Sequence, residues 1–446
     1  MRGSQQKVNV KLKRNHRLRL LVFMCTILTT GICSIAAIAD ELAKKADVFE
    51  YDMRERFVFG GQLAPKLRQV ELVDGVRSYN MPDNAYMTGL YTGILAMKYS
   101  VTKDESTRRK GSQALEALHL LCTASGIPGL LARAVVTPEM AKLDDGDWQP
   151  AADGKRVWRT DVSSDQMDGV FYGMIMAHDT FANAEEKKQI AKDASDLMDR
   201  LMADGYRIID YHGKPTEWGN YTEEYVTQRE PMNGLILLQH LKVAHHVTGN
   251  EKYATEYSRL AKDKGYAKLC VNAYQWRGAR HNYSDDVLLW LAYVPLLSLE
   301  KDEELLALYR ASLARAWNDT GEAGSGIKRQ ANPLFAYIAA TFLEDASGVA
   351  AATESLSLFP FEIKWNRPTI DAYAKQFGLT YDPAARSKEA APGDVVPLDR
   401  REKQWSVWVH KPFKPGDNDT AIPLEYNGHD YLLGYWLGRY SGVIPE

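Results

Sequence analysis

Cysteine is scarce in this sequence of 446 residues, and its spacing carries little information. Only four cysteines occur, and Cys25 and Cys33 fall in an apolar N-terminal segment. Cys122 and Cys270 lie in apolar stretches with helical spacing, where we favour buried free thiols over a disulfide bond. Because no cysteine spacing is typical of a zinc site, the sequence predicts no bound metal.

The sequence also lacks the short motifs that mark several large enzyme classes. It contains no Gly-x-Ser-x-Gly elbow, phosphate-binding loop, His-Glu-x-x-His or dinucleotide fingerprint. These absences exclude serine hydrolases of that type, kinases, zinc metalloproteases and dehydrogenases, and no cofactor is predicted. Because no linker rich in proline, serine or glycine divides the chain, we predict one domain over residues 40–446.

The N-terminus has the pattern of a secretion signal over residues 1–39. An uncharged apolar run over residues 20–39 ends in Ala37-Ile38-Ala39, the small-x-small pattern that favours cleavage before Asp40. A run of about 20 apolar residues could also span a bilayer as an uncleaved anchor. We therefore expect a periplasmic or secreted protein. The basic residues before the run are Arg2, Lys7, Lys11, Lys13, Arg14, Arg17 and Arg19.

The predicted mature chain is acidic. Removing those seven basic residues from a total of 55 leaves 48, against 58 acidic residues. This balance excludes a nucleic-acid partner, and we expect membrane contact only through an uncleaved anchor.

Apolar residues recur at helical spacing in pairs of segments separated by short polar turns, which predicts helical hairpins. Similar turns at 101–105 and 247–251 indicate an internal repeat. Segment 430–439 is a further amphipathic helix, whose expected partner is 41–58, so six hairpins close an all-α toroid. Minor β pieces are expected at 65–80 and 395–412. The other pairs are 83–100 with 106–123, 163–182 with 185–204, 229–248 with 250–269, 284–299 with 302–318, and 331–345 with 348–358.

Long connections between the hairpins predict where a site lies. In an up-down ring they all emerge at one end, and loops on a rigid scaffold concentrate functional residues. The helix N-termini that follow them favour negative charge, so an anionic group would suit this mouth. The connections are 124–162, 205–228, 270–283, 319–330 and 359–429.

Aromatic residues are concentrated in these connections. Their faces could stack on sugar rings, or they could simply form the cores of long ordered loops. The main candidates are Trp218, Tyr221, Trp276 and Tyr283, with Trp365 and Trp405 later in the chain.

Aspartates gather around the start of one predicted helix. Ser163 and Gln166 have the spacing of a capping box, which places Asp165 in the first helical turn and Asp168 in the second. Alternatively, the whole role of Asp165 could be to offset the helix dipole. Asp168 has apolar neighbours, which would raise its pKa toward that of a general acid.

Asp83 starts the first hairpin at the same end, either as a second carboxylate or as a helix N-cap. Two carboxylates across a groove are what glycoside hydrolysis requires. The acidic residues predicted at the mouth are Asp83, Asp161, Asp165 and Asp168.

Arginine and histidine recur in the same loops. Arginine offers a planar fork to a carboxylate or sulfate, although salt bridges to nearby acids are an equal alternative. His281 could act as an acid or base, or could hold a metal with Asp285 and Asp286, a spacing that is weak support. The cationic candidates are Arg133, Arg159, Arg229, Arg277 and Arg280.

Three segments together resemble the six-hairpin glycosidase-like superfamily, over most of residues 80–440. They are Asp83-Asn84-Ala85-Tyr86, residues 163–169 (Ser-Ser-Asp-Gln-Met-Asp-Gly) and residues 214–220 (Lys-Pro-Thr-Glu-Trp-Gly-Asn). The resemblance implies an (α/α)6 toroid and an enzyme such as an unsaturated glucuronyl hydrolase, another glycosidase or a polysaccharide lyase. Ser164-Asp165-Gln166-Met167 is similar to an Asp-Asp-x-x-Met segment of the glucuronyl hydrolases, which implies Asp165 or Asp168 as the acid. Ser164 departs from that pattern.

We therefore predict an exported glycoside hydrolase acting on acidic oligosaccharides, with Asp168 or Asp165 as proton donor and Asp83 as partner. One alternative is a lyase that uses His281 or Tyr283 as base. Another is a non-catalytic glycan-binding or envelope protein. The predicted substrate-binding residues are Arg133, Arg159, Asp161, Trp218, Tyr221, Arg229, Trp276, Arg280, Asn282 and Tyr283.

Overall fold

A computed structural model describes residues 30–68, 73, 75–318, 326–359, 367–379, 387–391, 394–401, 412 and 425–445. Residues 1–29, which hold most of the predicted signal, lie outside them. The first helix, α1 (Thr30–Arg56), runs through the predicted cleavage position between Ala39 and Asp40. Among the described residues, none of the helices has both the length and the apolar character needed to cross a membrane.

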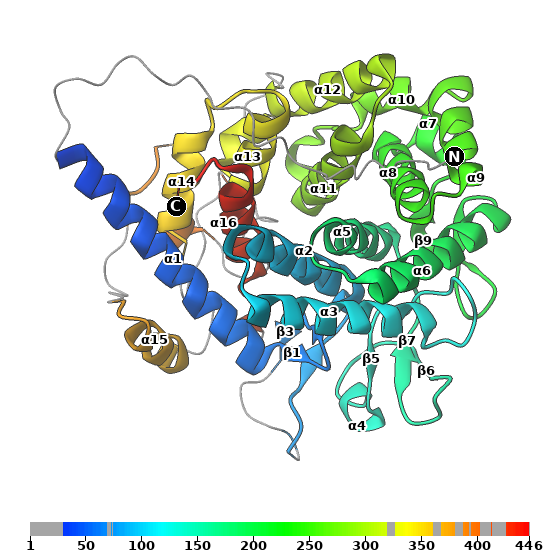
Figure 1. The fold of residues 1–446 in the computed structure, drawn as a ribbon, viewed down its shortest axis with the longest axis horizontal. Helices are drawn as coiled ribbons and strands as arrows, with labels where there is room; N and C mark the ends of the chain where they lie inside the picture. Colours follow the sequence, from blue (N-terminus) through cyan, green and yellow to red (C-terminus); the bar gives the residue numbers. More distant parts are fainter. Residues whose placement is uncertain are drawn as a thin grey trace, which may run out of the picture.

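Paired helices form the body of the molecule, as the hydrophobic periodicity predicts (Figure 1). Each hairpin has an inner helix buried nearly all round and an outer helix buried on one face, the two patterns expected for a central and a peripheral layer. The inner helices are α2 (Asn84–Thr102), α5 (Ser164–Thr180), α8 (Pro231–Thr248), α11 (Tyr283–Leu299), α13 (Pro333–Phe342) and α16 (His429–Ser441). The outer helices are α3 (Glu105–Thr123), α6 (Ala184–Ala203), α9 (Glu251–Ser258), α12 (Glu303–Asn318), α14 (Val349–Ser357) and α1.

The inner helices close into a ring. Each packs against the next in chain order, and α16 packs against α2. In Figure 1 the red α16 accordingly lies beside α2 and near the blue α1, so the two ends of the chain complete the last hairpin. The predicted pairing of 430–439 with 41–58 is confirmed.

Glycine permits a very close approach between α2 and α5. A Cβ atom at Gly89 would lie 1.9 Å from the carbonyl oxygen of Gly169, and one at Gly173 would lie 2.8 Å from the Cα of Gly89. Gly169 and Gly173 therefore allow α5 to lie directly against α2.

One outer helix differs from its prediction. The expected helix over 250–269 is divided into α9, a π-helical turn at Arg259–Asp263 and α10 (Tyr266–Leu269). Gly265, which has a φ of +69°, separates the last two. Shorter helices that the periodicity did not predict are α4 (Pro138–Ala141), α7 (Glu223–Gln228) and α15 (Arg367–Gln376).

Short antiparallel strands lie in the segments that connect the helices of the toroid. The β3–β4 pair falls in the predicted segment 65–80, and β10 from the C-terminal region joins its edge. Of the predicted segment 395–412, Leu398–Arg400 forms a 3-10 turn and residues 402–411 lie outside the described ranges. The loops hold further strands that the sequence did not predict. The strands are β1 (Val58–Phe59), β2 (Gln62–Leu63), β3 (Lys66–Leu67), β4 (Tyr79–Asn80), β5 (Val135–Val136), β6 (Trp148–Pro150), β7 (Val157–Arg159), β8 (Arg207–Ile209), β9 (Pro215–Asn220) and β10 (Glu425–Tyr426).

Cys122 and Cys270 are free and buried, as predicted.

Candidate active site

A pocket of about 720 Å³ opens at the end of the toroid where the inner helices begin. Each inner helix contributes residues from its first turns or from the position just before it. The predicted mouth is therefore a pocket built by helix N-termini, with β3, β9, α7 and β10 adding to its wall. The lining residues used below are Lys66, Asp83, Asp165, Trp218, Tyr225, Glu230, Arg277, Asn282, Asp285, Tyr426, His429 and Asp430.

Carboxyl groups from five inner helices line this pocket. Asp83 and Glu230 immediately precede α2 and α8, and Asp165, Asp285 and Asp430 lie in the first turns of α5, α11 and α16. The positive ends of the helix dipoles stabilise negative charge at such positions. Lys66 and Arg277 are the lysine and arginine in the lining.

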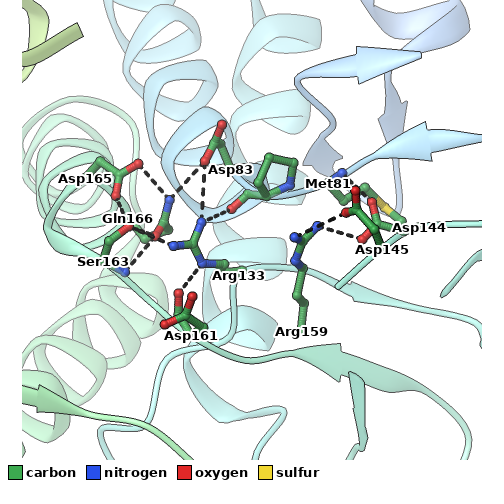
Figure 2. A network of polar contacts seen from close by, with 11 residues as sticks. Met81, Asp83, Arg133, Asp144, Asp145, Arg159, Asp161, Ser163, Asp165 and Gln166 are labelled. Carbon is green, nitrogen blue, oxygen red and sulfur yellow. Dashed lines mark hydrogen bonds and ion pairs between the residues drawn. The ribbon is translucent and has the colours of Figure 1, made fainter. Parts of the chain in front are cut away.

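Asp83 and Asp165 form a bridged pair (Figure 2). The side-chain amide of Gln166 donates to Asp83 Oδ1 at 3.3 Å and to Asp165 Oδ2 at 2.9 Å. The capping box between Ser163 and Gln166 is present, and the Ser163 hydroxyl also donates to Asp165. Asp83 occupies the N-cap position of α2, but its side chain makes no capping hydrogen bond. Its carboxyl group is turned instead toward Asp165.

The surroundings of Asp83 favour its protonated form. Burial raises the pKa of Asp83 to about 6, and the charge of Asp165 adds to this effect while Arg133 opposes it. Because the two carboxyls share one amide donor, their protonation states depend on each other.

Arg133 and Arg159 bind the segments that lead into the helices of this pair (Figure 2). Arg133 donates to the carbonyl oxygen of Pro82 at 2.8 Å and to the Ser163 hydroxyl at 2.9 Å, and it also binds the carbonyl oxygen of Asp161. It thereby joins the segments that begin α2 and α5.

Arg159 pairs with Asp144 at 2.6 Å, and Asp144 in turn accepts from the backbone N–H of Met81 at 2.8 Å. Asp161 has a φ of +62°, a left-handed conformation that costs energy for a residue other than glycine. Arg133, Arg159 and Asp161 are absent from the described pocket lining.

A second carboxyl pair, Glu230 with Asp285, lies at the starts of α8 and α11, the two inner helices that follow α5 around the ring. Burial raises the pKa of Asp285 to about 7, with further contributions from the charges of Glu230 and Asp286. Asn282 donates to Asp285 Oδ1 at 2.8 Å, and Arg277 lies 2.5 Å from Glu230.

His281 lies beside this pair but faces a smaller cavity of about 20 Å³. Its Nε2 is 3.1 Å from Asp286 Oδ1, and Gln330 donates to the other oxygen of Asp286 at 2.7 Å. The rings of Trp276 and Tyr283 pack on His281, with centroids 4.7 and 4.9 Å away. Asp285 does not join His281 in a group with metal-ligand spacing in the described structure.

Asp168 lies below the pocket. Its side chain is fully buried, and neither carboxyl oxygen has a hydrogen-bond partner among the described residues. Burial, helped by the charge of Asp165, raises the pKa of Asp168 well above its usual value, which favours the neutral form of this group.

The predicted aromatic residues divide into two groups. Trp218 of β9 is 58% exposed and lines the pocket beside Tyr225 of α7. Tyr221 and Tyr283 are buried, and Trp276 is half-buried against His281. Trp365 and Trp405 lie outside the described residues.

Of the remaining predicted residues, Asn282 lines the pocket, whereas the exposed Arg229 and Arg280 are not among its described lining. Sequence reasoning missed Glu230, His429, Asp430 and Lys66. Their position just before or within the first turn of inner helices was a usable signal for the first three, since those turns face the mouth. Lys66 belongs to β3, and no sequence pattern predicted that this strand reaches the pocket.

Comparison with known proteins supports the fold. No family model and no curated protein matches the sequence. A sugar epimerase from a ruminal bacterium matches with a TM-score of 0.51 and 13% identity, over 93% of this chain and all of that one. The cellobiose 2-epimerase from Spirochaeta thermophila DSM 6192 gives 0.46 and 14%, over 94% of this chain and 100% of that one.

An unsaturated glucuronyl hydrolase specific for heparin gives a TM-score of 0.44 and 11% identity, over 92% of this chain and 96% of that one. The likeness to the sugar epimerase shows the fold alone, an (α/α)6 toroid, as the sequence predicts.

Proposed function

From this (α/α)6 scaffold we propose that the chain is an exported carbohydrate-active enzyme, a glycoside hydrolase that uses carboxyl groups as acid and base. The observation that carries the proposal is the presence of two carboxyl pairs in the lining of one pocket, Asp83 with Asp165 and Asp285 with Glu230. Export is supported by the basic and apolar N-terminal segment.

Hydrolysis of a glycosidic bond needs one protonated and one ionised carboxyl. Asp285, with a pKa of about 7, retains a protonated fraction at neutral pH and is our proposed donor to the leaving oxygen. Asp83, with a pKa of about 6, is mostly ionised at that pH. It would take a proton from the attacking water or attack the sugar itself. Asp168, a donor candidate from the sequence, lies too deep to reach a substrate in the pocket.

Trp218 and Tyr225 offer ring faces at the pocket wall, where a pyranose could stack. Asn282 would position a hydroxyl group while holding Asp285. Tyr221, buried below, would support the wall without touching the sugar.

The charged residues of the pocket lining bear on the charge of the substrate. An acidic oligosaccharide was predicted from Arg133 and Arg280, and neither lines the pocket. The described lining holds five carboxyl groups, one lysine (Lys66) and one arginine (Arg277). Arg277 is already paired with Glu230. A neutral sugar at the reacting position therefore suits this pocket better than a uronate.

The test is a screen of the mature chain against neutral and acidic oligosaccharides, with new reducing ends as the readout. We expect Asp285→Asn to lower kcat by about 100- to 10,000-fold, the usual contribution of a general acid. Glu185→Gln on the exposed surface of α6 is the matched control and should keep full activity. Unchanged turnover in Asp285→Asn would overturn the assigned donor, and unchanged turnover in Asp83→Asn/Asp165→Asn as well would overturn the carboxyl mechanism.

A second candidate function is sugar epimerisation. His429 lines the pocket at the start of α16, and its Nε2 lies 3.0 Å from Asp430. Its Nδ1 lies 2.7 Å from the side-chain oxygen of Asn427, so one of these two contacts must break before the imidazole can take a proton from carbon. A changed sugar without new reducing ends, lost in His429→Gln, would favour this candidate.

Other outcomes of the screen would favour the remaining alternatives. An unsaturated product detected by its ultraviolet absorbance would favour the lyase with His281 or Tyr283 as base. Binding without turnover would favour a glycan-binding protein.

A further inference from the structure

A cluster of two histidines and an aspartate lies at the end of the toroid away from the pocket. His178 and Asp179 belong to the last turn of α5, and His246 belongs to the last turn of α8. Asp165 and His178 are thirteen residues apart on α5, so about 20 Å separates this cluster from the pocket. The proposed hydrolysis does not use it.

The three side chains already point at one another. Asp179 Oδ1 lies 2.6 Å from Nδ1 of His178 and 2.9 Å from Nε2 of His246. The two imidazole rings are nearly perpendicular, with centroids 5.4 Å apart. One nitrogen of each ring and one carboxyl oxygen fall within 4.8 Å of one another.

Ligand atoms on a tetrahedral zinc ion, at about 2.0–2.1 Å from the metal, are about 3.3 Å apart. Small side-chain rotations would therefore bring the three groups onto one ion.

Two further features distinguish this cluster from a chance surface pairing. The side chains are largely buried, with exposed fractions of 16% for His178, 10% for Asp179 and 22% for His246. They also lie at the C-terminal ends of two adjacent helices, where the helix dipoles favour a cation. The other histidine–acid contacts, such as His119 with Asp193 or His281 with Asp286, bring only two ligand groups together.

We propose that His178, Asp179 and His246 bind a divalent transition-metal ion of the zinc type, which links α5 to α8. Two imidazole nitrogens and one carboxylate oxygen are a ligand set suited to zinc, with water completing the tetrahedron. Since the ion would join neighbouring inner helices far from the pocket, its role is to stabilise the ring.

The experiment titrates the chelator-treated mature chain with Zn²⁺ and follows binding by calorimetry and unfolding by heat. We expect one equivalent to bind and the unfolding midpoint to rise with Zn²⁺ concentration, because the ion binds the folded chain. His246→Gln and Asp179→Asn should weaken binding by more than about 100-fold, since even outer-shell residues contribute about 10- to 100-fold.

His245→Gln is the matched control, because His245 is adjacent on α8 but its side chain faces Glu251, at 3.5 Å, and is not part of the cluster. It should bind Zn²⁺ as the unmodified chain does. Absence of saturable binding, or equal losses in the control and in His246→Gln, would overturn the proposal. Should the variants fail to fold, anomalous diffraction at the zinc edge from crystals of the unmodified chain decides the matter. An ion between α5 and α8 supports the proposal, and its absence there refutes it.

Discussion

At the scale of single residues, the pocket carboxyls differ in pKa because their surroundings differ. Asp285 must donate a proton, so activity should fall as the pH rises through about 7. Asp83 must be ionised, so activity should fall as the pH drops below about 6. We predict a bell-shaped dependence of kcat/KM on pH, measured at substrate concentrations below KM in a series of buffers.

The two limbs can be tested separately. In Asp83→Asn the acidic limb near pH 6 should be lost, because the group whose ionisation it reports is gone. A profile whose limbs stay in place in this variant would contradict the assignment.

The burial of Asp168 leads to a prediction about stability. Its folded-state pKa is raised, so the contribution of its protonated form is complete below the unfolded value and is lost as the pH rises toward the folded value. Between these two pKa values the chain therefore takes up a proton as it folds. Asp168→Asn removes this cost and should flatten the pH dependence by up to about 1.4 kcal/mol per pH unit.

The measurement is the urea unfolding midpoint of both chains at pH 5 and pH 7. The advantage of Asp168→Asn over the unmodified chain should be larger at pH 7. A constant difference would mean that Asp168 is ionised in the folded protein.

At the scale of elements, the α2–α5 contact depends on glycine. Gly89→Ala would place a methyl group 1.9 Å from the Gly169 carbonyl oxygen, so the helices must separate. We predict a loss of about 1–3 kcal/mol in the free energy of unfolding, together with lower activity because Asp83 and Asp165 move apart.

Ser100→Ala, near the end of the same helix, is the control and should change neither quantity appreciably. Equal stability of Gly89→Ala would show that the two helices can separate without cost.

Element boundaries explain why part of the site could be predicted and part could not. The start of α5 was predictable because a capping box is local, and it correctly placed Asp165 at the mouth. Glu230 and Asp285 also start inner helices, yet their pairing depends on how α8 and α11 pack together. Arg133 was predicted as a ligand of the substrate, but the fold directs its donors to Pro82, Ser163 and Asp161.

At the scale of the whole molecule, the N-terminal helix bears on export. Among the residues of α1 whose side chains the structure describes, the buried ones, such as Leu42, Phe49 and Met53, follow the predicted cleavage position. We predict that the mature chain begins at Asp40 and unfolds cooperatively at the same midpoint as the full-length chain. Mass spectrometry of periplasmic and membrane fractions gives the N-terminus. Recovery of the intact chain from the membrane fraction alone would show an uncleaved anchor.

The sequence by itself determined the helical hairpins, their pairing and the closure of the ring. The physical reason is that helical periodicity and caps are local, and inner helices apolar on all sides can be buried only inside a second layer. Only the tertiary structure decided that Asp83 faces Asp165, that Asp168 lies beneath the pocket, and that His178 meets His246. Those outcomes depend on how each helix is rotated and shifted along its axis relative to its neighbours. Contacts between residues far apart in the chain determine both.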